Sequence, residues 1–250
     1  MVLKQTLYLI GPLFLLGVWG LVTQLDLISP LLLPAPHHVF EKAAALFIGG
    51  VILPDIYYTL YRAAGGYAIG IVLGTILGIT TGLVASIHRS LEFVIDFGRS
   101  IPVITLYPLF MILFGIGDLS RMTTAAYPVM MIVLINTLYG VRNVKPVRKE
   151  VAKTKRLSLW RTLHWVIFPE ALPQIVVGYR VSLSWAYLLA IVTEMFVGTY
   201  AGLGSRVSDA YVSYEVAELY ATILTAGTVG YLLNKGFVLI EKRVIHWSDK

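Results

Sequence analysis

The chain of 250 residues contains no cysteine and few charged residues. Without cysteine it forms neither a disulfide framework nor a thiolate metal site, and it has no cysteine nucleophile. Charged residues make up only 14% and apolar residues 57%, whereas an average soluble chain is about 25% charged. A soluble fold of this size could not bury that much apolar surface, so the composition indicates a protein that lies in lipid.

Uncharged or nearly uncharged stretches of membrane-spanning length recur along the chain. The hydrocarbon core of a bilayer is about 30 Å thick and takes about 20 helical residues. Six stretches are predicted to span it: residues 5–25, 63–87, 100–117, 122–141, 171–197 and 219–240. The third contains Pro102 and Pro108 and is expected to be kinked or partly unwound. The sequence therefore predicts an all-α integral membrane protein with six transmembrane helices.

Basic residues gather between Arg142 and Arg161, in the loop between the fourth and fifth predicted spans, and within that stretch only Glu150 opposes them. Basic loops remain on the cytoplasmic side of a membrane. We therefore predict that both termini lie inside (N-in/C-in), together with the short connection that holds His88 and Arg89. The basic residues of the loop are Arg142, Lys145, Arg148, Lys149, Lys153, Lys155, Arg156 and Arg161.

The second predicted span carries a glycine at every fourth position over five turns. Because four residues turn a helix by slightly more than a full revolution, these glycines form a slowly winding groove along one face. Helices in lipid associate through small residues that let two backbones approach closely. The spacing predicts a tight helix–helix contact at Gly66, Gly70, Gly74, Gly78 and Gly82.

A few polar side chains lie within the predicted spans, and we take four as candidates for a translocation path: Asn136, Arg180, Ser184 and Glu194. A charged residue costs about 2.5–3.5 kcal/mol at the centre of a bilayer, so such groups usually face protein or water. Arg180 and Glu194 lie toward opposite ends of the fifth span, and anchoring at the two membrane surfaces is the alternative for both.

The basic loop also contains a short amphipathic helix. Ser158 is its expected N-cap, and Phe168-Pro169 is expected to end it. Its apolar side is formed by Leu159, Trp160, Leu163, Val166 and Ile167. Such a helix either lies on the lipid surface or docks into a groove of a partner protein.

This loop resembles the EAA loop of ABC importer permease subunits, whose pattern is E-A-A, three residues, G, nine residues and I-x-L-P. Glu150, Ala152 and Pro169 match it, and Val166 and Phe168 are apolar substitutes for its isoleucine and leucine. One departure is Arg156, which occupies the position of the glycine, where the family makes a tight turn.

The resemblance extends over most of the chain, roughly residues 30 to 247. Short motifs recur here in the order found in the nitrate, sulfonate, taurine and bicarbonate class of these permeases. They are Leu33-Pro34-Ala35-Pro36, Thr59-Leu60-Tyr61-Arg62, Ile101-Pro102, Pro108-Leu109, Phe114-Gly115-Ile116-Gly117, Glu194-Met195 and Gly202-Leu203-Gly204. Each motif is weak alone, and the ordered set is specific.

The resemblance implies a multi-pass permease of the bacterial inner membrane. It would pair with two ABC ATPase subunits, a periplasmic or lipid-anchored substrate-binding protein and a second permease copy as a homodimer. It further implies a five-helix type I permease core, residues 58–250, after an N-terminal span and outer loop, residues 1–57. Residues 142–173 would couple to the ATPase, with contacts at Glu150, Ala152, Arg156, Ser158, Trp160, Leu163 and Pro169.

The resemblance also implies a small solute, such as nitrate, bicarbonate, a sulfonate or taurine. The chain has no G-x-x-x-x-G-K-[ST] motif, so any ATP is expected on a partner subunit. No cofactor of its own is expected. A secondary transporter or channel with six spans and no ATPase is the alternative. An enzyme is not expected, because Glu194 has no carboxylate partner within the spans and the histidines have no metal-ligand spacing. No nucleic-acid partner is expected.

Overall fold

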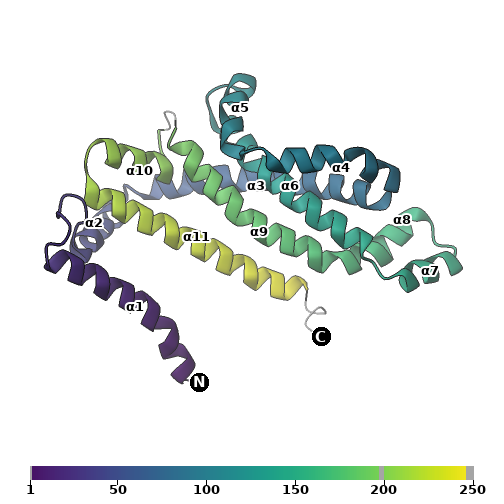
Figure 1. Cartoon of the computed structure of the whole chain (residues 1–250), viewed down its shortest axis with the longest axis horizontal. Helices are drawn as coiled ribbons and strands as arrows, with labels where there is room; N and C mark the ends of the chain where they lie inside the picture. Colours follow the sequence, from purple (N-terminus) through teal and green to yellow (C-terminus); the bar gives the residue numbers. More distant parts are fainter. Residues whose placement is uncertain (1, 197–199, 246–250) are drawn as a thin grey trace.

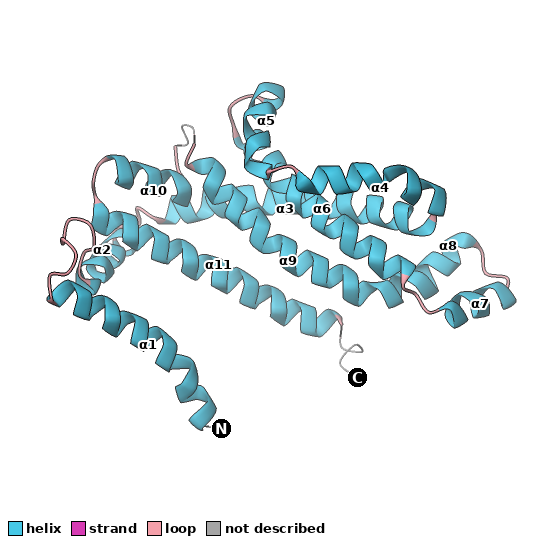
Figure 2. Cartoon of the chain, in the orientation of Figure 1, coloured by secondary structure: helices cyan, strands magenta, loops and turns pink. Residues whose placement is uncertain are grey.

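The computed structural model describes residues 2–196 and 200–245, and the described part contains helices and no β-strand (Figure 2). Long helices lie along the longest axis of the molecule, short helices lie at its two ends, and a further short helical segment projects from near its middle (Figure 1). The helices are α1 (Val2–Gln24), α2 (Pro36–Ile48), α3 (Leu53–Leu83), α4 (Ala85–Ser100), η1 (Val103–Leu106), α5 (Tyr107–Phe114), α6 (Asp118–Arg142), α7 (Pro146–Thr154), α8 (Leu159–Thr162), η2 (Leu163–Ile167), α9 (Phe168–Glu194), α10 (Leu203–Val212) and α11 (Val216–Val244).

Four helical stretches are long and apolar enough to cross a membrane: α3, α6, α11 and the stretch from α8 through α9, Leu159–Glu194. A fifth crossing is formed if α4 and the segment Val103–Phe114 count as one broken span, and Ile10–Gln24 of α1 is a shorter apolar helix. The fold class is therefore all-α with four to five apolar spans.

The five regularly spaced glycines of α3 pack against α6. A Cβ atom added to any of them would come within 2.5–2.8 Å of a heavy atom of α6. The facing residues are Ala125, Val129, Val133, Thr137 and Val141, in the same order as the glycines, so α3 and α6 run parallel. Because no side chain separates the helices, their backbones approach closely, as small residues allow in lipid.

The third predicted span, residues 100–117, covers only the second part of a bent pair of helices, because the first part, α4, begins at Ala85. The segment Val103–Phe114 turns away from α4 by 94°, with Pro102 capping η1 and Pro108 in the first turn of α5, so the predicted kink is confirmed. The prediction of a short connection at His88 and Arg89 is wrong, since both lie in α4. A search for uncharged stretches does not detect α4, because this helix carries the charged residues Arg89, Glu92, Asp96 and Arg99.

The amphipathic helix of the basic loop continues into α9. The prediction that Phe168-Pro169 ends it is wrong, because Leu159–Glu194 is one helical stretch. A π-helical turn, Leu163–Ile167, precedes the proline, which lies in the first turn of α9. Proline has no N–H to donate to the preceding turn, and the π-helical turn is where the regular hydrogen-bond pattern is interrupted, so the helix can continue past Pro169.

Short helices cover the end of the molecule opposite α7 and α8, which we call the α10 end (Figure 1). Sequence analysis predicted neither α2 nor α10. Val39 and Leu46 of α2 form a buried cluster with Ile52, with Leu203 of α10 and with Ala221 of α11. The Trp19 indole of α1 donates a hydrogen bond to the Pro34 carbonyl at 3.0 Å, which anchors α1 to this layer.

Candidate functional site

Arg62 of α3 lies buried at the α10 end between two carboxylates. Its Nε donates to Asp118 at 2.7 Å, and its Nη1 donates to Glu194 at 2.7 Å and to the Ala201 carbonyl at 2.8 Å. The side chains of Arg62 and Glu194 are 5% and 0% exposed. Buried charges persist when they are paired and hydrogen-bonded, so this cluster ties α6, α9 and the segment before α10 to α3.

The Glu194 carboxylate completes its hydrogen bonds within the same cluster. It accepts from the Thr59 hydroxyl at 2.8 Å and from the Gly204 amide at 2.9 Å, and the Thr59 oxygen accepts from the Leu203 amide at 2.8 Å. A Cβ atom at Gly204 would lie 2.0 Å from the Ile191 carbonyl oxygen. Glycine is therefore required for α10 to begin against the end of α9.

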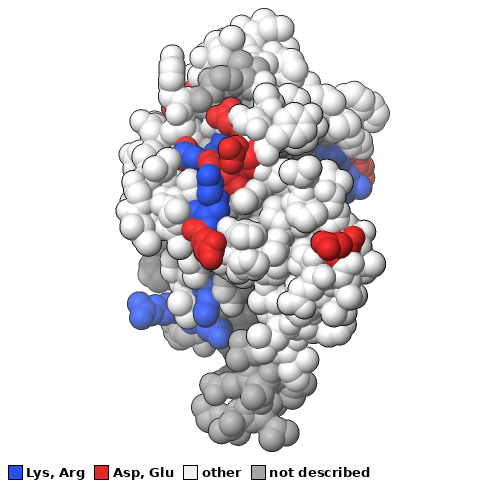
Figure 3. Space-filling view, turned by 90° about the vertical axis from the view of Figure 1, so that its left-hand side faces the viewer, with Lys and Arg blue, Asp and Glu red and all other residues white. Residues whose placement is uncertain are grey.

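A second set of charges continues the cluster toward α11. Asp55 accepts from the Gly202 amide at 2.8 Å and from Arg206, which also donates to Glu218 at 2.7 Å. Glu218 lies 3.0 Å from Lys42 of α2. Burial lowers the pKa of Arg206, but its hydrogen bonds and ion pairs with the two carboxylates outweigh burial and raise the pKa above its ordinary value. Basic and acidic side chains accordingly adjoin on this end in Figure 3.

Three motifs that were separate in the sequence meet at this cluster. The motif from Thr59 to Arg62, Glu194, and the motif from Gly202 to Gly204 supply its hydrogen bonds. Sequence analysis did not single out Asp55 or Asp118. The spacing of Asp55, four residues before Thr59, is one signal that would have placed it on the same face of α3. A role of Glu194 in translocation stays a prediction.

The predicted coupling loop begins with α7. Glu150 is exposed and pairs with Lys153 at 2.8 Å, whereas Ala152 is buried, at 2% exposure. The chain then turns at Arg156, whose φ is +50°. The Arg156 amide donates to the Lys153 carbonyl at 2.8 Å, and the Leu157 amide donates to the Ala152 carbonyl at 3.0 Å. These are the two hydrogen bonds of a Schellman motif, so the tight turn is made with arginine in the glycine position.

The second part of the loop presents apolar side chains outward. The Ser158 hydroxyl oxygen accepts from the Arg161 amide, which confirms the N-cap. Leu159 is 91% and Trp160 74% exposed, whereas Leu163 is half-buried against the cluster of Val141, Ile167 and neighbours. One side of the helical segment therefore packs against the bundle, and the apolar side chains of Leu159 and Trp160 are exposed.

The remaining path candidates lie on α6 and α9. The side-chain oxygen Oδ1 of Asn136 accepts a hydrogen bond from Nε2 of the Gln174 side chain at 2.8 Å. Arg180 lies 3.5 Å from Glu241 of α11, so it is paired within the bundle. Ser184 lines a cavity of about 540 Å³ between α9 and α11. The structure does not bring these three together with Glu194 in one site, and their role in translocation stays a prediction.

Residues 70–245 match a family described as Binding-protein-dependent transport system inner membrane component. This stretch includes the loop, the second part of α3 from Gly70 onward, and all of α6, α9 and α11. The chain belongs to this family. It is an ABC transporter permease, a multi-pass inner-membrane transport component and not an enzyme. The predicted division at residues 57 and 58 stays a prediction.

Curated relatives match the permease over nearly its whole length. It is 30% identical to the taurine transport system permease protein TauC of Escherichia coli, over 99% of this chain and 92% of the relative. It is 29% identical to the putative aliphatic sulfonates transport permease protein SsuC of Bacillus subtilis, over 96% of this chain and 87% of the relative.

Solved structures share the fold of the permease. A chain of the MetNI methionine ABC transporter in an inward-facing conformation superposes with a TM-score of 0.70 at 17% identity, covering 79% of this chain and 97% of that one. A chain of an amino acid ABC transporter with histidines gives a TM-score of 0.61 at 15% identity, covering 80% and 95%.

The left-handed conformation of Arg156 leads to a stability prediction. A residue with a Cβ atom in this conformation costs about 1–2 kcal/mol, partly offset by the larger backbone entropy of glycine in the unfolded chain. Arg156→Gly should therefore raise the free energy of unfolding by up to about 1 kcal/mol, measured by thermal unfolding of the purified permease. Lys155→Gly is the matched control, because Lys155 has a φ of −78° and should lose stability. Equal effects of both variants would contradict the assignment.

Proposed function

We propose that the permease forms the translocation path of an ATP-driven importer for a small sulfonate or a similar small anion. The support is the near full-length similarity to permeases named for taurine and aliphatic sulfonates. Nitrate and bicarbonate remain members of the same proposed solute class. No cofactor is proposed on the permease itself, since ATP would bind to partner subunits.

The proposed topology has six spans: α1, α3, the bent pair of α4 with η1 and α5, α6, α9 and α11. The basic residues of the loop after α6 favour a cytoplasmic position for α7 and α8. Both termini would then lie inside, and the α10 end would face outward. A substrate-binding protein is proposed to dock at that outer end.

The observation that carries the proposed coupling role is the exposed apolar side of α8. Leu159 and Trp160 are almost bare, yet they belong to a helical stretch that continues to Glu194. Exposed aromatic anchors of this kind are typical of helices that dock in a groove. We propose that α8 docks on an ATPase subunit, with two ATPases serving a permease homodimer.

Motion of α8 would pass directly into the bundle. Because α8, the π turn and α9 form one helical stretch, a displacement at Trp160 shifts α9, whose far end is held by Glu194 in the Arg62 cluster. ATP-driven closure would thereby bias the permease between inward-open and outward-open states. A secondary transporter or channel is the rival, and it would work without an ATPase.

The test replaces Trp160 with alanine in the full-length permease. Truncating a central aromatic anchor costs about 2 kcal/mol or more, so ATPase co-purification and taurine uptake should fall about 10-fold or more. Ile76→Ala is the control, since Ile76 is also exposed (56%) but lies within α3, outside both the loop and the α10 end. Unchanged co-purification and uptake in Trp160→Ala, or uptake by the permease alone, would contradict the proposal.

A further inference from the structure

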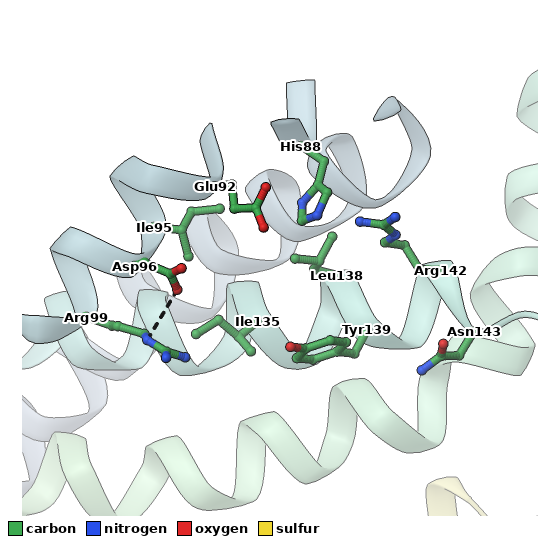
Figure 4. Close-up of a pocket in the computed structure, with 10 residues that line it drawn as sticks. All are labelled: His88, Glu92, Ile95, Asp96, Arg99, Ile135, Leu138, Tyr139, Arg142 and Asn143. Carbon is green, nitrogen blue, oxygen red and sulfur yellow. Dashed lines mark ion pairs between the residues drawn. The ribbon is translucent and has the colours of Figure 1, made fainter. Parts of the chain in front are cut away.

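A polar cavity of about 260 Å³ lies between α4 and α6, near the start of the loop. The polar face of α4 forms one wall, through His88, Glu92, Asp96 and Arg99, and the last turns of α6 form the other (Figure 4). Pockets for drug-sized ligands occupy about 300–1,000 Å³. The cavity therefore suits a small solute or a single headgroup.

The α4 wall carries two carboxylates and the guanidinium of Arg99, and the α6 wall carries the guanidinium of Arg142. On α4, Asp96 lies 3.4 Å from Arg99. Glu92 of α4 and Arg142 of α6 form no ion pair or side-chain hydrogen bond with any residue that the structure describes. In Figure 4 the ring of His88 lies between these two side chains. The cavity thus presents one unpaired carboxylate and one unpaired guanidinium.

His88 adds a third group that lacks a partner. Its Nδ1 is buried and has no hydrogen-bond partner within the described part of the chain. Buried polar atoms are nearly always hydrogen-bonded, to protein or to another molecule. Because Nδ1 is buried, a solute in the cavity would meet the His88 ring through its other atoms.

These charges select the chemistry of the occupant. A simple anion would meet Arg142 but also the carboxylates of Glu92 and Asp96, and a simple cation would meet both guanidinium groups. Like charges repel when they share a cavity of this size. A molecule with an ammonium group and an oxyanion a few bonds apart satisfies both walls at once.

We propose that this cavity binds a small zwitterion, with its oxyanion facing Arg142 and His88 and its ammonium group facing Glu92 and Asp96. Two sources share this chemistry: a free amino-sulfonate, which rests on the proposed function, and the headgroup of phosphatidylethanolamine. Arg142 and Asn143 also connect the cavity to the loop, because α7 begins three residues after Asn143. An occupant would therefore lie beside the proposed coupling segment.

The experiment measures binding to the full-length permease, co-purified with its ATPase and placed in lipid nanodiscs. Taurine and ethanesulfonate, which lacks the amine, are titrated by calorimetry. Arg142→Gln should weaken both probes about 10-fold or more, because both carry the sulfonate. Glu92→Gln should weaken taurine by a similar factor but should not weaken ethanesulfonate, because it removes a carboxylate that repels this simple anion. Arg89→Gln and Glu41→Gln, exposed charges outside the cavity, should leave both affinities unchanged.

Nanodiscs of phosphatidylglycerol or phosphatidylethanolamine separate the two sources. A free solute binds equally in both. A headgroup occupant weakens taurine binding in phosphatidylethanolamine alone, and Glu92→Gln abolishes that lipid effect. Absence of taurine binding in both lipids, or equal weakening of both probes by Glu92→Gln, overturns the proposal. If the ATPase still co-purifies in that case, only the cavity proposal fails. If the ATPase does not co-purify, the proposed function fails, and binding is measured on the permease alone.

Discussion

Replacing Gly70 and Gly74 together with alanine is expected to destabilise the permease by about 2–6 kcal/mol, since each overpacked position costs about 1–3 kcal/mol. An added Cβ atom would lie 2.5 Å from the Val129 side chain at Gly70 and 2.6 Å from the Met130 carbonyl oxygen at Gly74. A backbone carbonyl cannot rotate away, so α3 and α6 must separate. The measurement is thermal unfolding in detergent, with size-exclusion chromatography to detect loss of the folded species.

Two other glycines in a long apolar helix provide the control. Gly227 and Gly236 of α11 have no heavy atom within 4 Å of an added Cβ atom. Alanine at both should leave the protein as stable or slightly more so, because alanine is favoured over glycine in helices by about 0.8–1.0 kcal/mol per residue. If the α3 double variant were as stable as the α11 double variant, the close packing of α3 on α6 would be refuted.

Local patterns in the sequence were sufficient for the parts of the fold that repeat along one helix. The spacing from Gly66 to Gly82 identified the face of α3 that packs tightly, because four-residue periodicity is a property of the helix itself. Ser158 was recognised as an N-cap, which also depends only on neighbouring residues. Pro102 marked the bend after α4 for the same reason.

Contacts between distant segments could not be read in this way. Arg62 and Glu194 are separated by 132 positions, and no periodicity indicates which buried charge meets which. The motifs that contain Arg62 and Glu194 were recognised as motifs of the permease class, but the sequence did not indicate that the two residues form an ion pair. α4 was not predicted because it carries several charged residues and does not qualify as an uncharged span. The structure shows that some of these residues line a cavity between α4 and α6.

The structure also changes how the proline segment of the loop is understood. Pro169 was expected to stop a helix, yet the π turn before it allows α8 to continue into α9. A deletion of residues 158–167 would therefore disrupt a transmembrane helix as well as a docking surface. Point substitutions such as Trp160→Ala separate the two effects, which the deletion cannot do.

Replacing Glu194 with leucine is expected to destabilise the permease by about 3–5 kcal/mol, the cost of removing one partner of a buried ion pair. Arg62 would keep Asp118 but lose its fully buried partner, and the Thr59 hydroxyl and the Gly204 amide would lose their acceptor. Glu194→Gln should cost less, because its side-chain carbonyl oxygen still accepts a hydrogen bond. Equilibrium unfolding in mixed micelles gives the free energies.

The double variant Arg62→Met/Glu194→Leu tests whether Arg62 and Glu194 stabilise the permease as an ion pair or independently of each other. Well-packed apolar residues often replace a buried pair at little net cost, so the loss should fall short of the sum of the single losses by about 0.5–3 kcal/mol. Glu215→Leu is the matched control, since the side chain of Glu215 is 63% exposed and its loss should be within about 0.5 kcal/mol. Strictly additive losses for Arg62 and Glu194 would mean that the cluster does not hold the end of α9 to α3.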